Sequence, residues 1–156
     1  MVVGLLGRNA AHDSSAPHSE TPPARVVVVS PDVRGAAWWH AALRRRHFTV
    51  YAANSAETAG ALVAGSRPNV IVIDVTDNSF EGGALCRRLK AANATRPILL
   101  LHTHGTIDDL VAGFDSGADA YLRGSFTEAV LLAQIGALTR RQRYAAAVQD
   151  HMRVAQ

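Results

Sequence analysis

Two polar side chains able to do acid–base or ligand chemistry stand directly after runs of apolar residues. Asp74 follows the run at residues 70–73, and His102 follows the run at 98–101. Short apolar runs rich in β-branched residues are typical of strands buried on both faces of a parallel sheet. The carboxyl ends of such strands meet at one edge. We therefore expect Asp74 and His102 to be neighbours whose carboxylate–imidazole hydrogen bond would be sensitive to pH.

Other chemistry is less well supported by the residue types. Asp74, His102 and His104 could bind a transition metal, but two histidines with this spacing on a loop are a weak signal. Cys86 is the only cysteine, which excludes an internal disulfide or a CxxC site. No nucleophile with a matching base and no phosphate-binding loop appears, so we do not expect an enzyme.

The elements that position these side chains alternate regularly along the chain. Apolar runs predict five strands, at residues 26–29, 48–51, 70–73, 98–101 and 120–122. Helices are predicted at residues 32–46, 55–64, 83–92, 107–116 and from 127 onward. This (βα)5 order predicts an α/β, flavodoxin-like three-layer fold with a parallel five-stranded sheet of order 2-1-3-4-5. Its functional crevice should lie at residues 30–32 and 74–78, where the strand order reverses.

Residues with capping preferences mark the helix ends beside that crevice. Ser30 is expected to cap the first helix, with Pro31 at its first position and Asp32 in its first turn. Asp32 would then interact favourably with the helix dipole. Ser125 or Thr127 is expected to cap the last helix.

Composition sets the size and setting of the molecule. With 156 residues, 48% of them hydrophobic, the chain can bury one core. Residues 1–24, with several Ser and Pro, predict a flexible leader; residues 25–143 form the domain. Residues 144–156 contain no Pro or Gly and predict a helical extension, or a linker to an output domain absent from this chain.

Charge and hydropathy indicate where the protein works. The formal net charge of +3 is small and no dense basic block carries it, so we expect no direct contact with nucleic acid. No apolar run approaches the roughly 20 residues of a membrane span, and no secretory signal is recognisable. We expect a cytoplasmic protein that does not bind membranes.

Residues 25 to about 143 resemble the receiver domains (CheY-like) of bacterial two-component response regulators. Residues 70–74 look like the third strand ending in the phosphoacceptor aspartate, and Gly82 with residues 85–89 looks like the third helix. Residues 113–122 are similar to the stretch from the fourth helix into the fifth strand. The resemblance implies that Asp74 stands at the acceptor position and Tyr121 at that of the switch aromatic.

The chain departs from this family where phosphoryl chemistry needs support. The resemblance implies a divalent metal held by two acidic residues after the first strand, but Ser30 and Pro31 occupy those positions. The family's lysine falls at Gly124 and its switch hydroxyl at His102, and Asn78 replaces a proline. The resulting degenerate phosphorylation pocket comprises Ser30, Pro31, Asp32, Asp74, Thr76, His102, Thr103 and Gly124.

The leading hypothesis is an atypical receiver (a pseudo-receiver) that signals without phosphorylation, as a regulatory and dimerisation module in transcriptional control. Its partners would be a second copy, another signalling protein or its own output domain. No cofactor is expected, and magnesium binding should be absent or weak. Two copies would join through the face formed by the fourth helix, the fifth strand and the last helix, or through a loose heptad seam on the last helix that comprises Leu131, Ile135, Leu138, Ala145 and Met152.

Two alternatives stay open. The vacated acidic pocket, lined by Ser30, Pro31, Asp74, His102 and Gly124, is less charged than in the family and could accept a small-molecule effector. The other alternative is residual phosphorylation of Asp74 in a two-component system.

Overall fold

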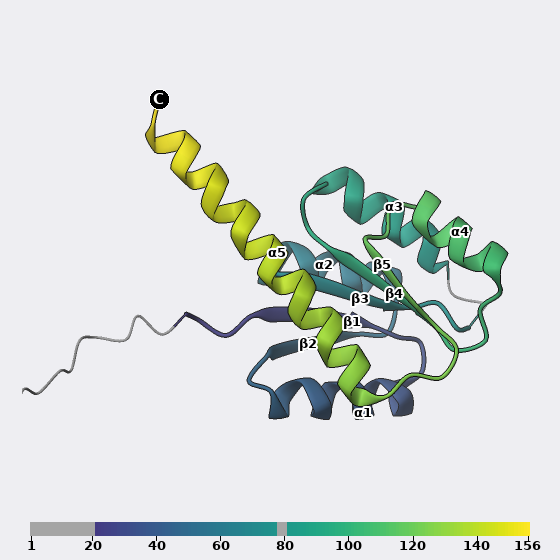
Figure 1. Cartoon of the computed structure of the whole chain (residues 1–156). Helices are drawn as coiled ribbons and strands as arrows, with labels where there is room; N and C mark the ends of the chain where they lie inside the picture. The colour runs from purple at the N-terminus through teal and green to yellow at the C-terminus, as the bar shows by residue number, and fades with distance from the viewer. Residues whose placement is uncertain (1–20, 78–80) are drawn as a thin grey trace, which may run out of the picture.

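The structure, a computed structural model, describes residues 21–77 and 81–156. A five-stranded parallel sheet of order β2-β1-β3-β4-β5 is covered by helices on both faces (Figure 1), so the predicted fold class is confirmed. Residues 1–20 of the expected leader, and Asn78, lie outside the described residues. The elements are β1 Arg25–Val29, α1 Val33–Arg45, β2 Thr49–Ala53, α2 Ala56–Ser66, β3 Val70–Asp74, α3 Gly82–Ala92, β4 Ile98–His102, α4 Ile107–Asp115, β5 Ala120–Arg123 and α5 Glu128–Val154.

The central strands are apolar throughout because each of their faces is covered. Every residue of β3 and β4 is buried. Ile71, Ile73 and Leu100 point to the face covered by α2 and α3, whereas Val72 and Leu101 point to the face covered by α1 and α5. Burial on both faces explains why these strands read as continuous apolar runs rather than as alternating patterns.

The start of α1 differs from the sequence prediction. Asp32, not Ser30, is the N-cap: its carboxylate accepts a hydrogen bond of 3.0 Å from the backbone N–H of Arg34. Pro31 therefore precedes the cap instead of occupying the first helical position. The Ser30 hydroxyl is free for another role because Asp32 satisfies the helix end. At the last helix the prediction of Thr127 as N-cap is confirmed.

The last helix, α5, has two parts with different surroundings. Leu131, Ile135 and Leu138 are buried in the core between α5 and the sheet of their own chain. The expected seam between two copies therefore cannot run through these three residues, and that part of the prediction is wrong. Beyond them α5 continues to Val154 and projects from the domain (Figure 1), with Met152 exposed.

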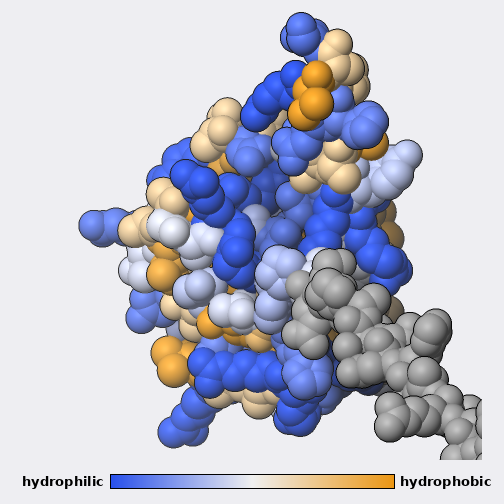
Figure 2. All heavy atoms as spheres, turned by 90° about the vertical axis from the view of Figure 1, so that its left-hand side faces the viewer, coloured by the Kyte–Doolittle hydropathy of each residue, from blue (hydrophilic) through white to orange (hydrophobic). Residues whose placement is uncertain are grey.

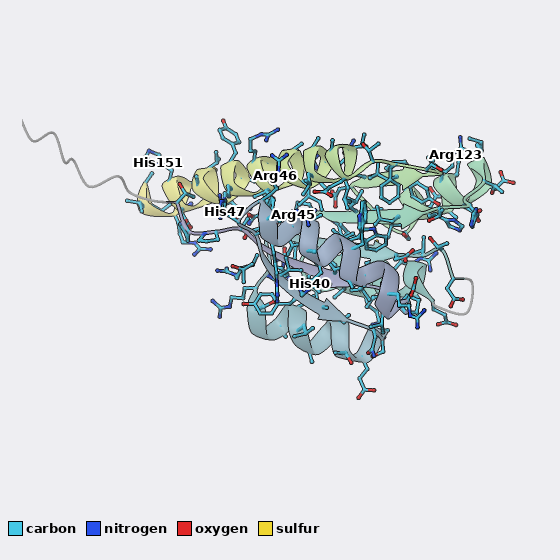
Figure 3. The ribbon with its side chains drawn as sticks, turned by 90° about the horizontal axis from the view of Figure 1, so that it is seen from below. His40, Arg45, Arg46, His47, Arg123 and His151 are labelled. Atoms are coloured by element: carbon cyan, nitrogen blue, oxygen red, sulfur yellow. The ribbon has the colours of Figure 1, made fainter. Side chains whose placement is uncertain are left out.

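The C-terminal end of α1 lies beside the start of α5. Arg45 donates two hydrogen bonds of 2.9 Å to the Glu128 carboxylate. Trp39 packs near Phe126, with ring centroids 6.5 Å apart. Arg45, the last residue of α1, is followed by Arg46 and His47, and all three lie next to α5 (Figure 3). Within residues 21–77 and 81–156, no helix combines the length and apolarity needed to cross a bilayer.

Candidate functional site

Asp74, the last residue of β3, is held by two hydrogen bonds at the carboxyl edge of the sheet. Its Oδ2 accepts from the Ser30 hydroxyl at 3.1 Å, and its Oδ1 accepts from the backbone N–H of Thr76 at 3.0 Å. Both Asp74 and Ser30 are buried, with 8% and 1% of their surfaces exposed. The carboxylate is thus fixed by neutral donors, which satisfy a buried acceptor without neutralising its charge.

Ser30 links Asp74 to the beginning of α1. Its hydroxyl oxygen accepts from the backbone N–H of Asp32 at 3.2 Å, and its single proton can go to Asp74 or to the carbonyl of Asp32. Ser30 is brought there by the parallel pairing of β1 with β3, in which Val29 lies opposite Ile73. A movement of this turn would therefore change the hydrogen bond that Ser30 donates to the Asp74 carboxylate.

A second pair of hydroxyls joins the loops after β3 and β4. The Thr76 and Thr103 hydroxyl oxygens lie 3.3 Å apart, and the backbone N–H of Thr103 donates to the Thr76 hydroxyl at 3.1 Å. The expected pocket residues Asp74, Thr76 and Thr103 are thus brought together. Both threonine pairings are exposed, so they contribute less to stability than the buried Ser30–Asp74 bond.

The expected pair of Asp74 and His102 is not formed. In the β3–β4 register Asp74 lies opposite Leu101, so His102 stands one residue further along and its side chain points to the other face of the sheet. Among the described residues the structure gives no hydrogen bond between them. The same geometry separates the three residues of the alternative metal site, Asp74, His102 and His104, and no group of three or more metal-binding side chains occurs in the described part of the chain.

His102 instead faces α4 and Tyr121. Its Nε2 lies 3.9 Å from Oδ2 of Asp109, and its Nδ1 and the Tyr121 hydroxyl are both buried with no hydrogen-bond partner among the described residues. Gly113 of α4 makes room for the Tyr121 ring, since a Cβ on Gly113 would lie 2.7 Å from Cε2 of the ring. Burial, and then the charge of Asp109, raises the pKa of Tyr121 above its ordinary value.

Asp109 is a site residue that the sequence reasoning missed. It forms a capping box with Thr106, in which each side chain accepts a hydrogen bond from the other residue's backbone N–H. The backbone and then the side-chain hydrogen bond from Thr106 lower the pKa of the Asp109 carboxyl. The Thr-x-x-Asp spacing before an apolar helix was the signal that could have identified it.

Gly124, where the resemblance would place a lysine, has a left-handed backbone. Its φ is +75°, a conformation that costs glycine little and other residues more. Its N–H donates to the carbonyl of His102 at 3.1 Å. Arg123 does not replace the missing cation, because it is paired with His102 in the register and alternation directs it to the face opposite Asp74.

The side chains around Asp74 do not fit a magnesium ion. Magnesium prefers an octahedron of oxygens that includes one or two carboxylates. Here the Pro31 side chain has no oxygen that could bind a metal. The Asp32 carboxylate caps α1, and the Ser30 hydroxyl is already hydrogen-bonded to Asp74.

The fold and the carboxylate at the end of β3 define a receiver-type signalling domain, and comparison with known proteins gives the same answer. The family described as response regulator receiver domain matches residues 26–136. The chain is 34% identical over 119 residues to the response regulator MprA of Mycolicibacterium vanbaalenii, covering 76% of this chain and 52% of the relative. The MprA of Mycobacterium leprae is 39% identical over 94 residues, covering 60% of this chain and 41% of that relative.

Solved structures agree on the fold. A CheY-like receiver domain protein from Methanospirillum hungatei aligns with a TM-score of 0.73 at 19% identity, covering 79% of this chain and 98% of that one. A putative response regulator from Chloroflexus aurantiacus aligns with a TM-score of 0.70 at 28% identity, covering 76% and 98%. The family match over residues 26–136 shows that the chain belongs to the response regulator receiver domain family. It spans about half the length of the curated relatives it matches.

Proposed function

We propose that this receiver domain signals in the cytoplasm by binding rather than by phosphotransfer. The observation that carries the proposal is the environment of Asp74, whose carboxylate is held by the Ser30 hydroxyl and the Thr76 N–H. A phosphoryl group on this carboxylate would raise the negative charge at a buried position from one to about two. Ser30, Pro31 and Gly124 supply neither a carboxylate for a metal nor a cation for the phosphate.

Magnesium should bind wild-type protein weakly or not at all. We expect no saturable change in the amide NMR signals of Ser30, Asp74 and Thr76 as magnesium is added through the millimolar range. The double variant Ser30→Asp/Pro31→Asp supplies two carboxylates at the end of β1 and should gain saturable binding at the same amides. Saturable binding by wild type that disappears in Asp74→Asn would contradict the proposal.

Regulation by binding requires a partner, and a second copy of the chain is the one we propose. The projecting part of α5 exposes Tyr144, Val148 and Met152, which recur every four residues and share one side of the helix. An isolated helix of this length is marginal in water, which favours a partner along it. Figure 2 shows small hydrophobic patches among hydrophilic atoms at the top of the molecule, where α5 ends. These three residues and Ala145, which is also exposed, form the α5 stripe. We propose this stripe as the dimer contact in place of the seam expected from the sequence.

The dimer should depend on the end of α5. Light scattering on the full chain at micromolar concentration should give twice the monomer mass, whereas a chain ending at Arg143 should be monomeric. This truncation retains the buried half of α5 and should not unfold the domain. Tyr144→Ser/Met152→Ser should weaken the dimer in the same way. Equal masses for the full and shortened chains would show that this stripe does not join two copies.

An effector sensor is the second candidate function, and it is favoured by a hollow of about 360 Å³ that reaches Ser30. The sequence placed the effector among Ser30, Pro31, Asp74, His102 and Gly124. That location is not supported, because Asp74 and His102 point to opposite faces of the sheet. The third candidate function is residual phosphorylation of Asp74. It would give a phosphoryl adduct on incubation with acetyl phosphate and magnesium.

A further inference from the structure

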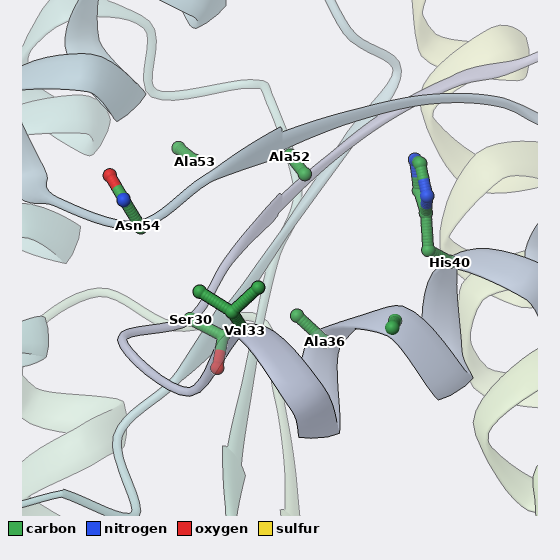
Figure 4. Close-up of a pocket in the computed structure, with 8 residues that line it drawn as sticks. Ser30, Val33, Ala36, His40, Ala52, Ala53 and Asn54 are labelled. Carbon is green, nitrogen blue, oxygen red and sulfur yellow. The ribbon is translucent and has the colours of Figure 1, made fainter.

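A hollow of about 360 Å³ lies between the first half of α1 and the carboxyl end of β2 (Figure 4). Its lining comes from two nearby segments of the chain, residues 30–40 at the start of α1 and residues 52–54 at the end of β2. The lining includes Ser30, Val33, Ala36, His40, Ala52 and Asn54. The hollow is therefore at the same edge of the sheet as Asp74.

Small side chains create this hollow. The buried residues of α1, namely Trp39, Ala42 and Leu43, all lie in its second half. In the first half, Ala36 offers only a methyl group to the space above β2. Ala52 lies two residues after buried Val50, so both side chains point to the face that α1 covers. Ala52 is nevertheless exposed. The hollow is open to solvent at Ala52 and lies at the functional edge of the sheet, so a small molecule could enter it.

The lining determines what kind of molecule fits. Most of the lining surface is apolar, and Val33, Ala36 and Ala52 contribute isopropyl and methyl groups to it. Asn54 brings an amide, which can both donate and accept a hydrogen bond. His40 brings an imidazole whose Nε2 lies 3.4 Å from the Val50 carbonyl oxygen. The described residues that line the hollow include no Lys, Arg, Asp or Glu, so a charged ligand would lose solvation without gaining an ion pair.

We propose that the hollow binds a small, uncharged, flat organic molecule with one or two polar groups, and that Ser30 transmits its binding to Asp74. The volume falls in the range of small-molecule sites. Ser30 lines the hollow and also donates to the Asp74 carboxylate at 3.1 Å. The same hydroxyl accepts from the N–H of Asp32, the N-cap of α1. A ligand that shifts the start of α1 therefore changes the hydrogen bonding of Asp74.

This inference rests on the proposed function, because ligand binding would change the hydrogen bonding of Asp74, the residue at which phosphorylation would otherwise act. Indole, which is flat and uncharged and has one N–H donor, is the probe for the test. Titration of indole into the full-length protein should give saturable changes in the amide NMR signals of Ser30, Ala52 and Asn54. Asp74 and Thr76 should change along the same binding curve, since they lie outside the hollow and are reached through Ser30.

Matched variants on α1 show whether the hollow is the site. Ala36→Leu fills the space and should weaken indole binding on the order of tenfold or more, a loss of about 1.4 kcal/mol. Ala41→Leu adds the same atoms at an exposed position of the same helix that does not line the hollow, and should bind as wild type does. Asn54→Ala removes the amide without adding bulk, so it should also weaken binding while leaving the fold intact.

Either of two results would overturn the inference: no saturable change at Ser30, Ala52 and Asn54, or unchanged binding by both Ala36→Leu and Asn54→Ala. Transmission through Ser30 is tested separately by Ser30→Ala, which should keep the changes at Ala52 and Asn54 but lose those at Asp74. Persistence of the Asp74 changes in Ser30→Ala would refute that route. Phosphorylation of Asp74 in the same samples would contradict the proposed function but not the site, so the two failures are distinguishable.

Discussion

Ile135→Ala should lower the free energy of unfolding by about 2–5 kcal/mol. Ile135 lies in α5 with none of its surface exposed, packed in the core that α1 and α5 form against the sheet. Removing three carbons there loses apolar burial and leaves a cavity that a sheet of paired strands cannot easily close. Urea denaturation followed by circular dichroism measures the change.

The same experiment separates a core position from a dimer contact. The loss for Ile135→Ala should be equal at low and high protein concentration, because the contacts lie within one chain. Val148→Ala, on the exposed part of the same helix, should change the free energy of unfolding of the isolated subunit by no more than about 0.5 kcal/mol. A loss for Ile135→Ala that vanishes on dilution would mean that Ile135 belongs to an interface between copies.

The fold was predictable because the strong signals are local. Continuous apolar runs at residues 70–73 and 98–101 favour burial on two sides, and helices on both faces of a parallel sheet provide it. Every predicted strand and helix is present in the structure, with ends that differ by no more than two residues. Such runs leave few alternatives for the order of elements.

The site was less predictable because it depends on single-residue offsets. Asp74 and His102 both end a strand, but a register shift of one residue places their side chains on opposite faces. Both Ser30 and Asp32 are good N-caps, and only the position of the turn shows that Asp32 is used. Propensities do not contain this information.

The helix at the end of the chain shows a different kind of ambiguity. Leu131, Ile135 and Leu138 are spaced four and three residues apart, which suits a heptad seam and equally suits one helix packed on a sheet. Tertiary packing decides between them, and here it buries all three residues within their own chain. Beyond Arg143 the helix leaves the domain, so there the pattern again fits a contact with another chain.

Acetyl phosphate with magnesium should leave Asp74 unmodified. Transfer would attach a phosphoryl group to a buried carboxylate oxygen, and the donors to this carboxylate are the Ser30 hydroxyl and the Thr76 N–H. Those donors cannot balance the added charge, and with Gly124 where the family's lysine would stand, no side chain at that position can do so. The expected difference from a complete receiver domain is therefore one between reaction and no reaction.

Intact mass spectrometry after incubation with acetyl phosphate and magnesium is the most direct test of the central claim. A receiver domain that has both acidic residues and the lysine, incubated in the same way, serves as the control that the donor is active. The account predicts that the mass of this chain stays unchanged while the control gains about 80 Da, the mass of one HPO3 group. A stoichiometric gain of that size by this chain, absent from Asp74→Ala, would contradict it.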